Sequence, residues 1–314
     1  MKIGYPCINT SIERKAPSTF RLAFYSENRL IQTVEDNLKH LTKVLKYNVD
    51  HDLLFFRISS DIVPFASHPI CKFDWDKHFQ SEFKEVGDYI KKHHIRISMH
   101  PDQFVVINSQ SEKIVNSSIN ELKYHCRVLD CMNLAETAKI QIHVGGAYGN
   151  KIDAIDRFVK IYNNDNNTLL DEYIKRRLVI ENDDRLYNLS DCLHINQKTA
   201  IPILLDTFHH ECFNSGEESL VSALKKAKST WKKDKDGIPM VDYSSQNVMD
   251  ILYHGTNRRP KKGKHTTAID QILFNRFLKE TAGLDFDIML EIKDKEKSAL
   301  IALGLLRKQD KHDC

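Results

Sequence analysis

Short apolar runs recur along the chain at nearly regular intervals. The segment Ile201–Asp206, for example, reads Ile-Pro-Ile-Leu-Leu before its first charged residue. A run of this length predicts a strand that is buried on both faces, as the strands of a parallel sheet are. Eight such strands are expected, over Lys2–Cys7, Leu53–Ser59, Ile95–His100, Lys139–Gly145, Arg177–Asn182, Ile201–Asp206, Pro239–Ser244 and Asp287–Lys293.

Amphipathic segments separate these strands. In Glu27–Val49, valine and leucine recur every three or four residues, which places them on one face of a helix. The polar run Asn163–Asn167 is expected to be an exposed loop. Further helices are expected over His78–His93, Ser111–Ala135, Ile152–Tyr162, Glu217–Lys228 and Ala268–Thr281, with a shorter helix after a cap at Ser190.

The alternation of strands and helices predicts the α/β class and a single (βα)8 TIM barrel over residues 1–314. No second set of elements indicates another domain. A doubly wound open sheet is the alternative fold. That fold normally carries a glycine-rich first turn, and Gly4–Cys7 is not one.

A histidine or a carboxylate stands at the end of each strand from the third to the eighth. These residues are His100, His143, Glu181, Asp206, Asp242 and Glu291. Because the C-terminal strand ends of a barrel surround one cavity, the six side chains should converge there. His209 and His265 follow the sixth and seventh strands and can approach from the same side. One such residue alone is more often a cap or a satisfied core group, but the series of eight predicts a metal site.

Eight ligands exceed the number that one ion uses, so a cluster of two or three divalent ions is expected. Imidazoles and carboxylates without a thiolate favour Mn²⁺, with Mg²⁺, Co²⁺ or Zn²⁺ as alternatives. Such clusters suit phosphodiester hydrolysis, because they lower the pKa of a bound water and polarise the phosphate. In this interpretation the catalytic carboxylates that hold the ions together are Glu181, Asp206 and Glu291.

Composition and charge add weaker constraints. The net charge of +3 permits a polyanionic partner without requiring one. The seven cysteines are scattered and form no Cys-x-x-Cys pair, which disfavours a disulfide framework and a thiolate zinc site. No signal peptide and no run of membrane-spanning length is evident, so we expect a cytoplasmic protein that needs no membrane and no obligate protein partner.

Two basic runs and one loop can each be interpreted in two ways. Lys225–Lys235 and Arg258–Lys264 both flank the seventh strand and are expected to form a phosphate-binding rim, or else an ordinary solvated surface. Gln103 and Phe104 follow His100 at the expected cavity mouth. Such a pair usually packs within the protein, but at this place it can also wedge into a stacked duplex.

Seven segments carry a resemblance to a known family. They are Gly4–Cys7, Phe65–Pro69, Ser98–Phe104, His143–Gly149, Glu181–Asp184, Asp206–His210 and Met289–Lys293. Together they resemble the motifs of the UV damage endonucleases, TIM-barrel enzymes that are related to the abasic-site endonucleases. The segments span nearly the whole chain in the expected order, and as a set they are highly specific.

The resemblance implies metal-dependent incision of damaged double-stranded DNA, so the protein would be nucleoid-associated when on DNA. The nick would lie immediately 5′ to a cyclobutane pyrimidine dimer or a 6-4 photoproduct and leave a 3′-hydroxyl and a 5′-phosphate. The metal ligands of the family fall on His100, His143, Glu181, Asp206, His209, His265 and Glu291. Its lesion-probing pair falls on Gln103 and Phe104, and its other DNA contacts fall on Tyr5, Asn9 and His68.

Three residues depart from the pattern of some family members. Phe104 stands where those members have tyrosine, and Asp242 stands where they have a histidine ligand. Met240 replaces a lysine that is carboxylated and binds metal, so one ligand of a third ion is lost.

The alternatives to a UV damage endonuclease are an abasic-site endonuclease, a metal-dependent sugar isomerase on the same barrel, and a lesion-binding module without catalysis.

Overall fold

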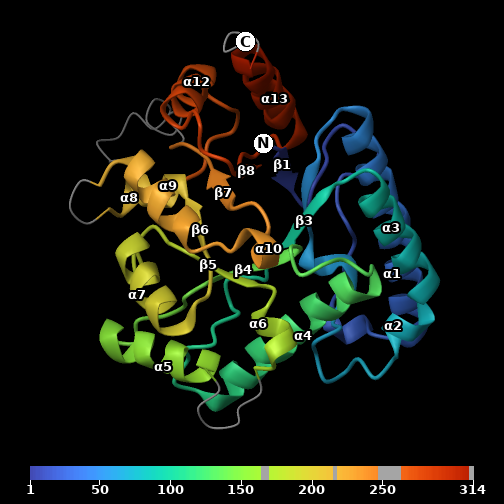
Figure 1. Ribbon diagram of the computed structural model, residues 1–314. Coiled ribbons are helices and arrows are strands. Elements are labelled where there is room, and N and C mark those ends of the chain that lie inside the picture. Colours follow the sequence, from blue (N-terminus) through green and yellow to red (C-terminus); the bar gives the residue numbers. More distant parts are fainter. Residues whose placement is uncertain (164–169, 215–217, 247–262, 311–314) are drawn as a thin grey trace, which may run out of the picture.

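Eight parallel strands form a closed barrel in a computed structural model that describes residues 1–163, 170–214, 218–246 and 263–310 (Figure 1). The last strand pairs in parallel with the first, with Ile288 opposite Ile3. This closure confirms the predicted TIM barrel and excludes an open doubly wound sheet. The strands are β1 (Ile3–Pro6), β2 (Phe55–Ile58), β3 (Arg96–Met99), β4 (Lys139–His143), β5 (Leu178–Glu181), β6 (Ile203–Asp206), β7 (Met240–Tyr243) and β8 (Asp287–Leu290).

Helices surround the barrel (Figure 1). None of the described helices is long and apolar enough to cross a membrane. The longer helices are α1 (Glu27–Asp50), α3 (Gln80–Lys92), α4 (Glu112–Cys131), α5 (Lys151–Asn163), α7 (Leu189–Thr199), α9 (Leu220–Ser229), α12 (Gln271–Glu280) and α13 (Glu296–Asp310). The short ones are η1 (Leu22–Phe24), η2 (Ser60–Ile62), α2 (Trp75–His78), α6 (Glu172–Lys175), α8 (Thr207–Cys212) and α10 (Lys233–Asp236).

The predicted helices are all present, but several of their ends differ from the prediction. The cap of α7 is Asn188 rather than Ser190, because Asn188 and Asp191 form a reciprocal capping box. The sixth strand begins at Ile203, just after Pro202, which has no N–H to donate to a neighbouring strand. Helices α8 and α13 were not expected. Most of the polar run Asn163–Asn167 lies outside the described residues.

The barrel interior contains a layer of apolar side chains below the strand ends. Its members are Phe55, Val179, Leu204, Met240 and Met289, with Trp231 beneath them. Met240 is only 1% exposed and packs within this layer. A buried thioether of this kind fills space in the core and is a poor ligand for hard divalent ions.

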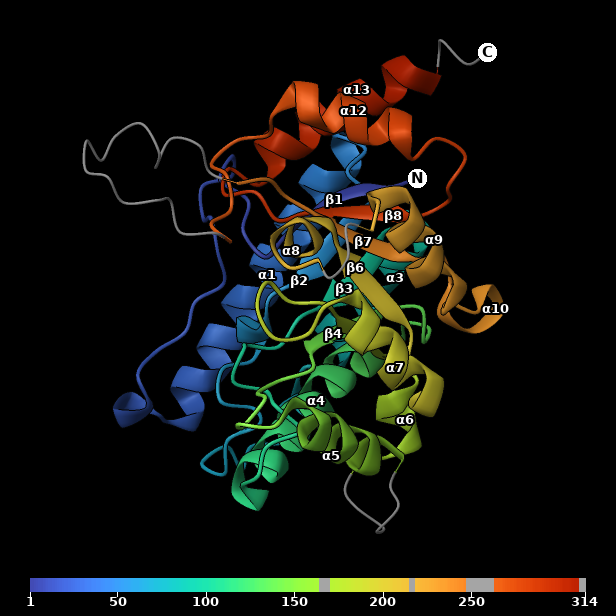
Figure 2. The ribbon, with the colours of Figure 1, turned by 90° about the vertical axis from the view of Figure 1, so that its left-hand side faces the viewer.

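Ion pairs close the other end of the barrel. Arg96 Nη1 lies 2.8 Å from Asp287 Oδ2, and Lys139 Nζ lies 2.8 Å from Asp236 Oδ1. Asp236 belongs to α10, which leads into the N-terminal end of β7 and so lies at the end of the barrel opposite the strand C-termini (Figure 2). The basic run Lys225–Lys235 ends in α10, away from the candidate ligands, which favours the interpretation of this run as an ordinary solvated surface over that of a phosphate-binding rim. Of Arg258–Lys264, only residues 263 and 264 are described.

Candidate metal centre

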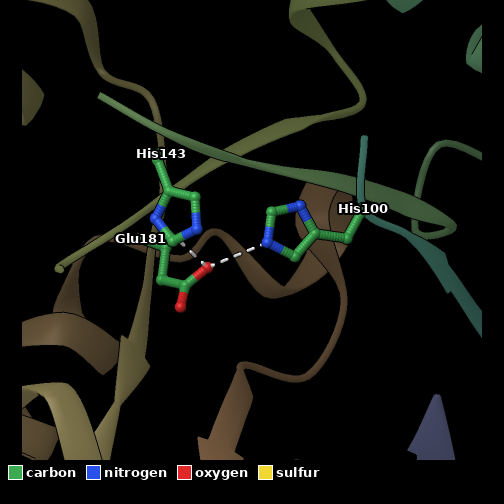
Figure 3. A group of neighbouring side chains, drawn as sticks. All are labelled: His100, His143 and Glu181. Carbon is green, nitrogen blue, oxygen red and sulfur yellow. Dashed lines mark ion pairs between the residues drawn. The ribbon is translucent and has the colours of Figure 1, made fainter. Parts of the chain in front are cut away.

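Glu181 is the centre of the predicted cluster. It is the last residue of β5 and only 1% exposed. Its Oε2 lies 3.5 Å from Nε2 of His100, which follows β3, and 3.9 Å from Nδ1 of His143, which ends β4. Its Oε1 lies 3.2 Å from Nδ1 of His209. Figure 3 shows the two imidazoles of His100 and His143 beside the Glu181 carboxylate.

Asp206 ends β6 and also caps the helix that follows it. Its Oδ1 accepts a hydrogen bond of 2.7 Å from the backbone N–H of His209. The short helix α8 that results brings the His209 ring to the site, with Nδ1 3.5 Å from Asp206 Oδ2. His209 Nδ1 also lies 3.0 Å from the carbonyl oxygen of Asn182. Since a carbonyl can only accept, Nδ1 donates there, which leaves Nε2 as the nitrogen that could bind a metal ion after losing its proton.

Glu291 and His265 complete the ring of predicted residues. Glu291 follows β8, and its backbone oxygen accepts a 2.8 Å hydrogen bond from His265 Nδ1. The His265 Nε2 atom lies 3.9 Å from Glu291 Oε2. The rings of His265 and His209 are 6.1 Å apart between centroids. His265 therefore lies beside the other predicted ligands.

Three groups of side chains in the described structure could each hold a metal ion. They are His100, His143 and Glu181; Glu181, Asp206 and His209; and Asp206, Asp242 and Glu291. Within each group the ligand atoms lie within 4.8 Å of one another. Glu181 and Asp206 are each shared by two groups, which is the arrangement that bridging carboxylates require. The closed barrel thus brings the strand-end residues together.

Several atoms of these groups are buried without a hydrogen-bond partner. They are His100 Nδ1, His143 Nδ1 and Asp206 Oδ2. A buried polar atom without a partner is unfavourable by about 1–3 kcal/mol. Imidazole nitrogens and carboxylate oxygens are ligands that divalent transition metals accept. The residues present therefore fit a metal centre.

The charges of the site also favour cations. Burial, reinforced by Glu181 and Glu291, raises the pKa of Asp206 to about 6 in spite of the nearby His209. Burial opposes the charged form of His209, but Asp206 and Glu181 outweigh it and raise the pKa of His209 to about 11. Burial likewise opposes ionisation of Glu181, yet His143 and His100 hold the pKa of Glu181 well below its usual range. Each carboxylate thus depends on nearby positive charge.

Arg57 and Gln141 belong to the site, although neither was predicted. Both point into the barrel, from β2 and β4, and both are buried. The Arg57 guanidinium contacts Asp242 at 2.7 Å and also contacts Glu291. A charged or amide residue inside an apolar strand run was the available signal in the sequence. Both residues lie within their strands and not at the strand ends, where the predicted site residues lie.

A cavity of about 1430 Å³ opens beside the metal-ligand groups. His143 and His209 line it, together with the predicted DNA-contacting residues His68, Gln103 and Phe104. The Phe104 side chain is 75% exposed. The structure thus brings these three residues into the same hollow as the candidate ligands.

Tyr5 and Asn9 do not line this cavity in the structure. Both are fully buried, and Tyr5 lies between the barrel and α1, where its hydroxyl donates a 2.5 Å hydrogen bond to Asn48. Asn9 donates to the same hydroxyl at 2.7 Å. Because alternate residues of a strand face opposite sides, Tyr5 turns away from the barrel interior. The burial of Tyr5 and Asn9 therefore gives no support to their predicted contact with DNA.

Known proteins resemble the chain over nearly its full length. A UV DNA damage endonuclease of Clostridium perfringens is 35% identical over 311 residues, which are 99% of this chain and 72% of that protein. One of Bacillus cereus strain Q1 is 35% identical over 87% of this chain and 82% of its own length. The crystal structure of SacUVDE superposes with a TM-score of 0.89 at 42% identity, covering 99% of each chain.

More distant structures share the fold alone. Endonuclease IV of Thermus thermophilus superposes with a TM-score of 0.55 at 13% identity, over 87% of this chain and 94% of that one. The family model described as UV-endonuclease UvdE matches residues 1–312. With a match of this length and relatives of this identity, the chain belongs to the UV-endonuclease UvdE family.

Proposed function

We propose that this protein is a metal-dependent endonuclease that nicks double-stranded DNA immediately 5′ to UV photoproducts, with residues 1–314 acting as one domain. The observation that carries the proposal is the pairing of candidate metal groups with an exposed Phe104 around one cavity. Membership of the family, whose relatives are UV DNA damage endonucleases, supports the choice of substrate. The products would be a 3′-hydroxyl and a 5′-phosphate.

The dimensions of the cavity favour a macromolecular substrate. Pockets for small molecules usually measure about 300–1,000 Å³, and this cavity measures about 1430 Å³. A cyclobutane pyrimidine dimer or a 6-4 photoproduct stacks poorly, so unstacking it costs less than unstacking normal bases. In our proposal the damaged dinucleotide leaves the helix and Phe104, with Gln103, fills the gap. His68 would contact the DNA from the same wall.

The candidate ligands would hold two or three divalent ions, with Mn²⁺ as the first choice. The proposed ligand set is His100, His143, Glu181, Asp206, His209, His265 and Glu291. When bound, such ions lower the pKa of a water and neutralise charge on the phosphate. Glu181 and Asp206 lie between groups, so they would fix the separation of the ions.

The protein side chains themselves would orient the reaction. Burial lowers the pKa of His100 and so favours the neutral ring, which is the form that binds metal. Donation from His209 Nδ1 to the Asn182 carbonyl fixes the orientation of that ring. Burial opposes ionisation of Glu291, but the ion pair with Arg57 outweighs it and lowers the pKa of Glu291 to about 2, so this carboxylate stays charged. The site is thus arranged before DNA binds.

The decisive experiment is incision of a duplex that carries one defined pyrimidine dimer, with added Mn²⁺. We expect a nick immediately 5′ to the dimer, and a loss of at least about 100-fold in the Glu181→Gln variant, because amide nitrogen replaces a shared ligand oxygen. Equal activity of the variant would contradict the proposed site. A folded, Mn²⁺-loaded wild type that leaves the duplex intact would contradict the function. A duplex with one abasic site, tested in parallel, measures the preference between the two lesions.

A further inference from the structure

The guanidinium of Arg57 lies inside the carboxylate cluster. The side chain comes from β2 and is 3% exposed. Its Nη2 lies 2.9 Å from Oδ1 and 2.7 Å from Oδ2 of Asp242, and its Nη1 contacts Glu291 Oε1. Asp242 and Glu291 are two of the three members of the third metal-ligand group. A positive charge is therefore already present in that group.

Gln141 connects this cation to the rest of the cluster. Its Oε1 accepts a 2.7 Å hydrogen bond from Arg57 Nη2. Its Nε2 donates to Asp242 Oδ2 at 2.7 Å and to Glu181 Oε2 at 2.5 Å. Both oxygens of Asp242 thus have donors from the protein itself.

Other candidate ligands differ from Asp242 in this respect. Among the members of the three groups, the buried side-chain atoms without a hydrogen-bond partner are His100 Nδ1, His143 Nδ1 and Asp206 Oδ2. All three residues belong to the groups that contain Glu181, and Asp206 belongs to the third group as well. Asp242 is equally buried, at 0% exposure, but both of its oxygens are hydrogen-bonded. Unsatisfied atoms are therefore found on His100, His143 and Asp206, and not on Asp242.

The net charge of the cluster also argues against a third metal ion. The cluster holds four carboxylates, and Arg57 offsets one of them. Two divalent ions would leave the cluster with a net charge of about +1, whereas a third would leave about +3 in a buried site. A third ion on Asp242 would also lie next to the guanidinium. The preceding inward residue of β7 is Met240, so that strand offers no second hard ligand.

We infer that Arg57 takes the place of a third cation, so that the protein binds two divalent ions and pairs Asp242 with Arg57 rather than with metal. The inference rests on the proposed metal-dependent function and narrows its metal site. Asp242, which the sequence suggested as a metal ligand, becomes a positioning residue. Through Arg57 and Gln141 it holds Glu291 and Glu181 in place.

The test is the number of Mn²⁺ ions bound per chain. Free Mn²⁺ is followed by its electron paramagnetic resonance signal during titration, and bound metal is measured by elemental analysis after gel filtration. We expect two ions in the wild type, two in Asp242→Asn, and fewer than two in the matched variant Asp206→Asn. Three ions in the wild type, falling to two in Asp242→Asn, would overturn the inference.

Substitution of Arg57 provides a second test, in which the number of bound ions should rise. Arg57→Met frees Asp242 and Glu291, so we expect it to bind one additional ion, whereas Arg57→Lys keeps the charge and should bind two. Circular dichroism establishes that each variant is folded, and if Arg57→Met does not fold, the wild type and Asp242→Asn decide. Nicking of the dimer-containing duplex is measured separately. A wild type that nicks DNA but binds three ions contradicts only this inference, and one that binds two ions without nicking contradicts only the function.

Discussion

Phe104 shows how much one side chain can indicate about a surface. Phe104 lines the cavity on the loop after β3 and is 75% exposed, and three further exposed apolar side chains, Ile114, Tyr148 and Leu186, line the same cavity. Stacking of a base on an aromatic ring contributes about 1–3 kcal/mol. The exposed ring is therefore best explained by a partner that brings its own aromatic surface, as DNA bases do.

We predict that Phe104→Ala reduces incision of the dimer-containing duplex by about 5- to 100-fold, the range that loss of one stacking contact gives. Phe104→Tyr keeps the ring and should retain most of the activity. Ile152 is 71% exposed on α5 and lies outside the residues that line the cavity, so Ile152→Ala is the matched control. Incision rates at subsaturating DNA provide the measurement. Wild-type rates in Phe104→Ala would exclude a role for Phe104 in filling the gap that the damaged dinucleotide leaves.

His40 is a buried histidine that the function does not use. It lies on α1, is 4% exposed, and neither ring nitrogen has a hydrogen-bond partner. Burial, together with Arg14 and Lys43, lowers its pKa to about 4. The unfolded chain takes up a proton at this residue near pH 6.5, while the folded chain stays neutral down to about pH 4. The free energy of unfolding therefore falls as pH drops through this interval.

We predict that wild-type protein loses about 1–2 kcal/mol more stability between pH 7.5 and pH 5 than the His40→Gln variant does. The measurement is urea unfolding at both pH values. His194 is exposed on α7, and His194→Gln should behave like the wild type. If His40→Gln shows the same pH dependence as the wild type, the neutral buried histidine is not the cause.

At the scale of elements, two helical glycines show how packing can reverse an intrinsic preference. Gly87 lies in α3, where an added Cβ would be 1.8 Å from the backbone oxygen of Met132 at the end of α4. Gly304 lies in α13 and would meet nothing within 4 Å. Alanine favours a helix over glycine by about 1 kcal/mol. Only the position in the fold decides whether that gain is realised.

We predict opposite effects of the same substitution in these two helices. Gly304→Ala should raise the free energy of unfolding by about 0.5–1 kcal/mol. Gly87→Ala should lower it by about 1–3 kcal/mol or more, because the helices must move apart. Urea unfolding of both variants under identical conditions measures the difference. Stabilisation by Gly87→Ala would mean that α3 and α4 pack less closely than described.

At the scale of the whole molecule, the barrel holds like charges together at one end. Four carboxylates from β5 to β8 converge there, while the other end is closed by neutral ion pairs such as Arg96 with Asp287. A ligand that binds only the folded state stabilises it, by about 2.7 kcal/mol at a concentration of 100 times Kd. Metal binding and folding should therefore be coupled.

We predict that saturating Mn²⁺ raises the thermal unfolding temperature of metal-free protein by several degrees. The shift should be clearly smaller in Glu181→Gln, which loses a ligand atom shared by two groups. Differential scanning calorimetry with and without Mn²⁺, after treatment with a chelator, makes the comparison. An unchanged unfolding temperature in the wild type would show that the folded chain binds no ion tightly.

Local sequence patterns were sufficient to predict the barrel and the ring of candidate ligands at the strand ends. Hydrophobic periodicity is local, and a parallel barrel places every strand C-terminus around one cavity, so His100, Glu181 and Asp206 could be predicted without coordinates. Local patterns also located α1 and β6 to within a few residues. Caps such as Asn188 were less certain, because several neighbouring residues can fill that role.

Which side chains share a surface depends instead on the closed barrel. Tyr5 and Arg57 both lie in short apolar strands, yet one packs against α1 and the other enters the carboxylate cluster. The register of the barrel determines to which side each side chain points, and no single segment of the sequence specifies that register. The same holds for Lys225–Lys235, whose charge is evident in the sequence but whose place at the far end of the barrel follows from chain direction. Contacts between distant segments arise only once the barrel closes.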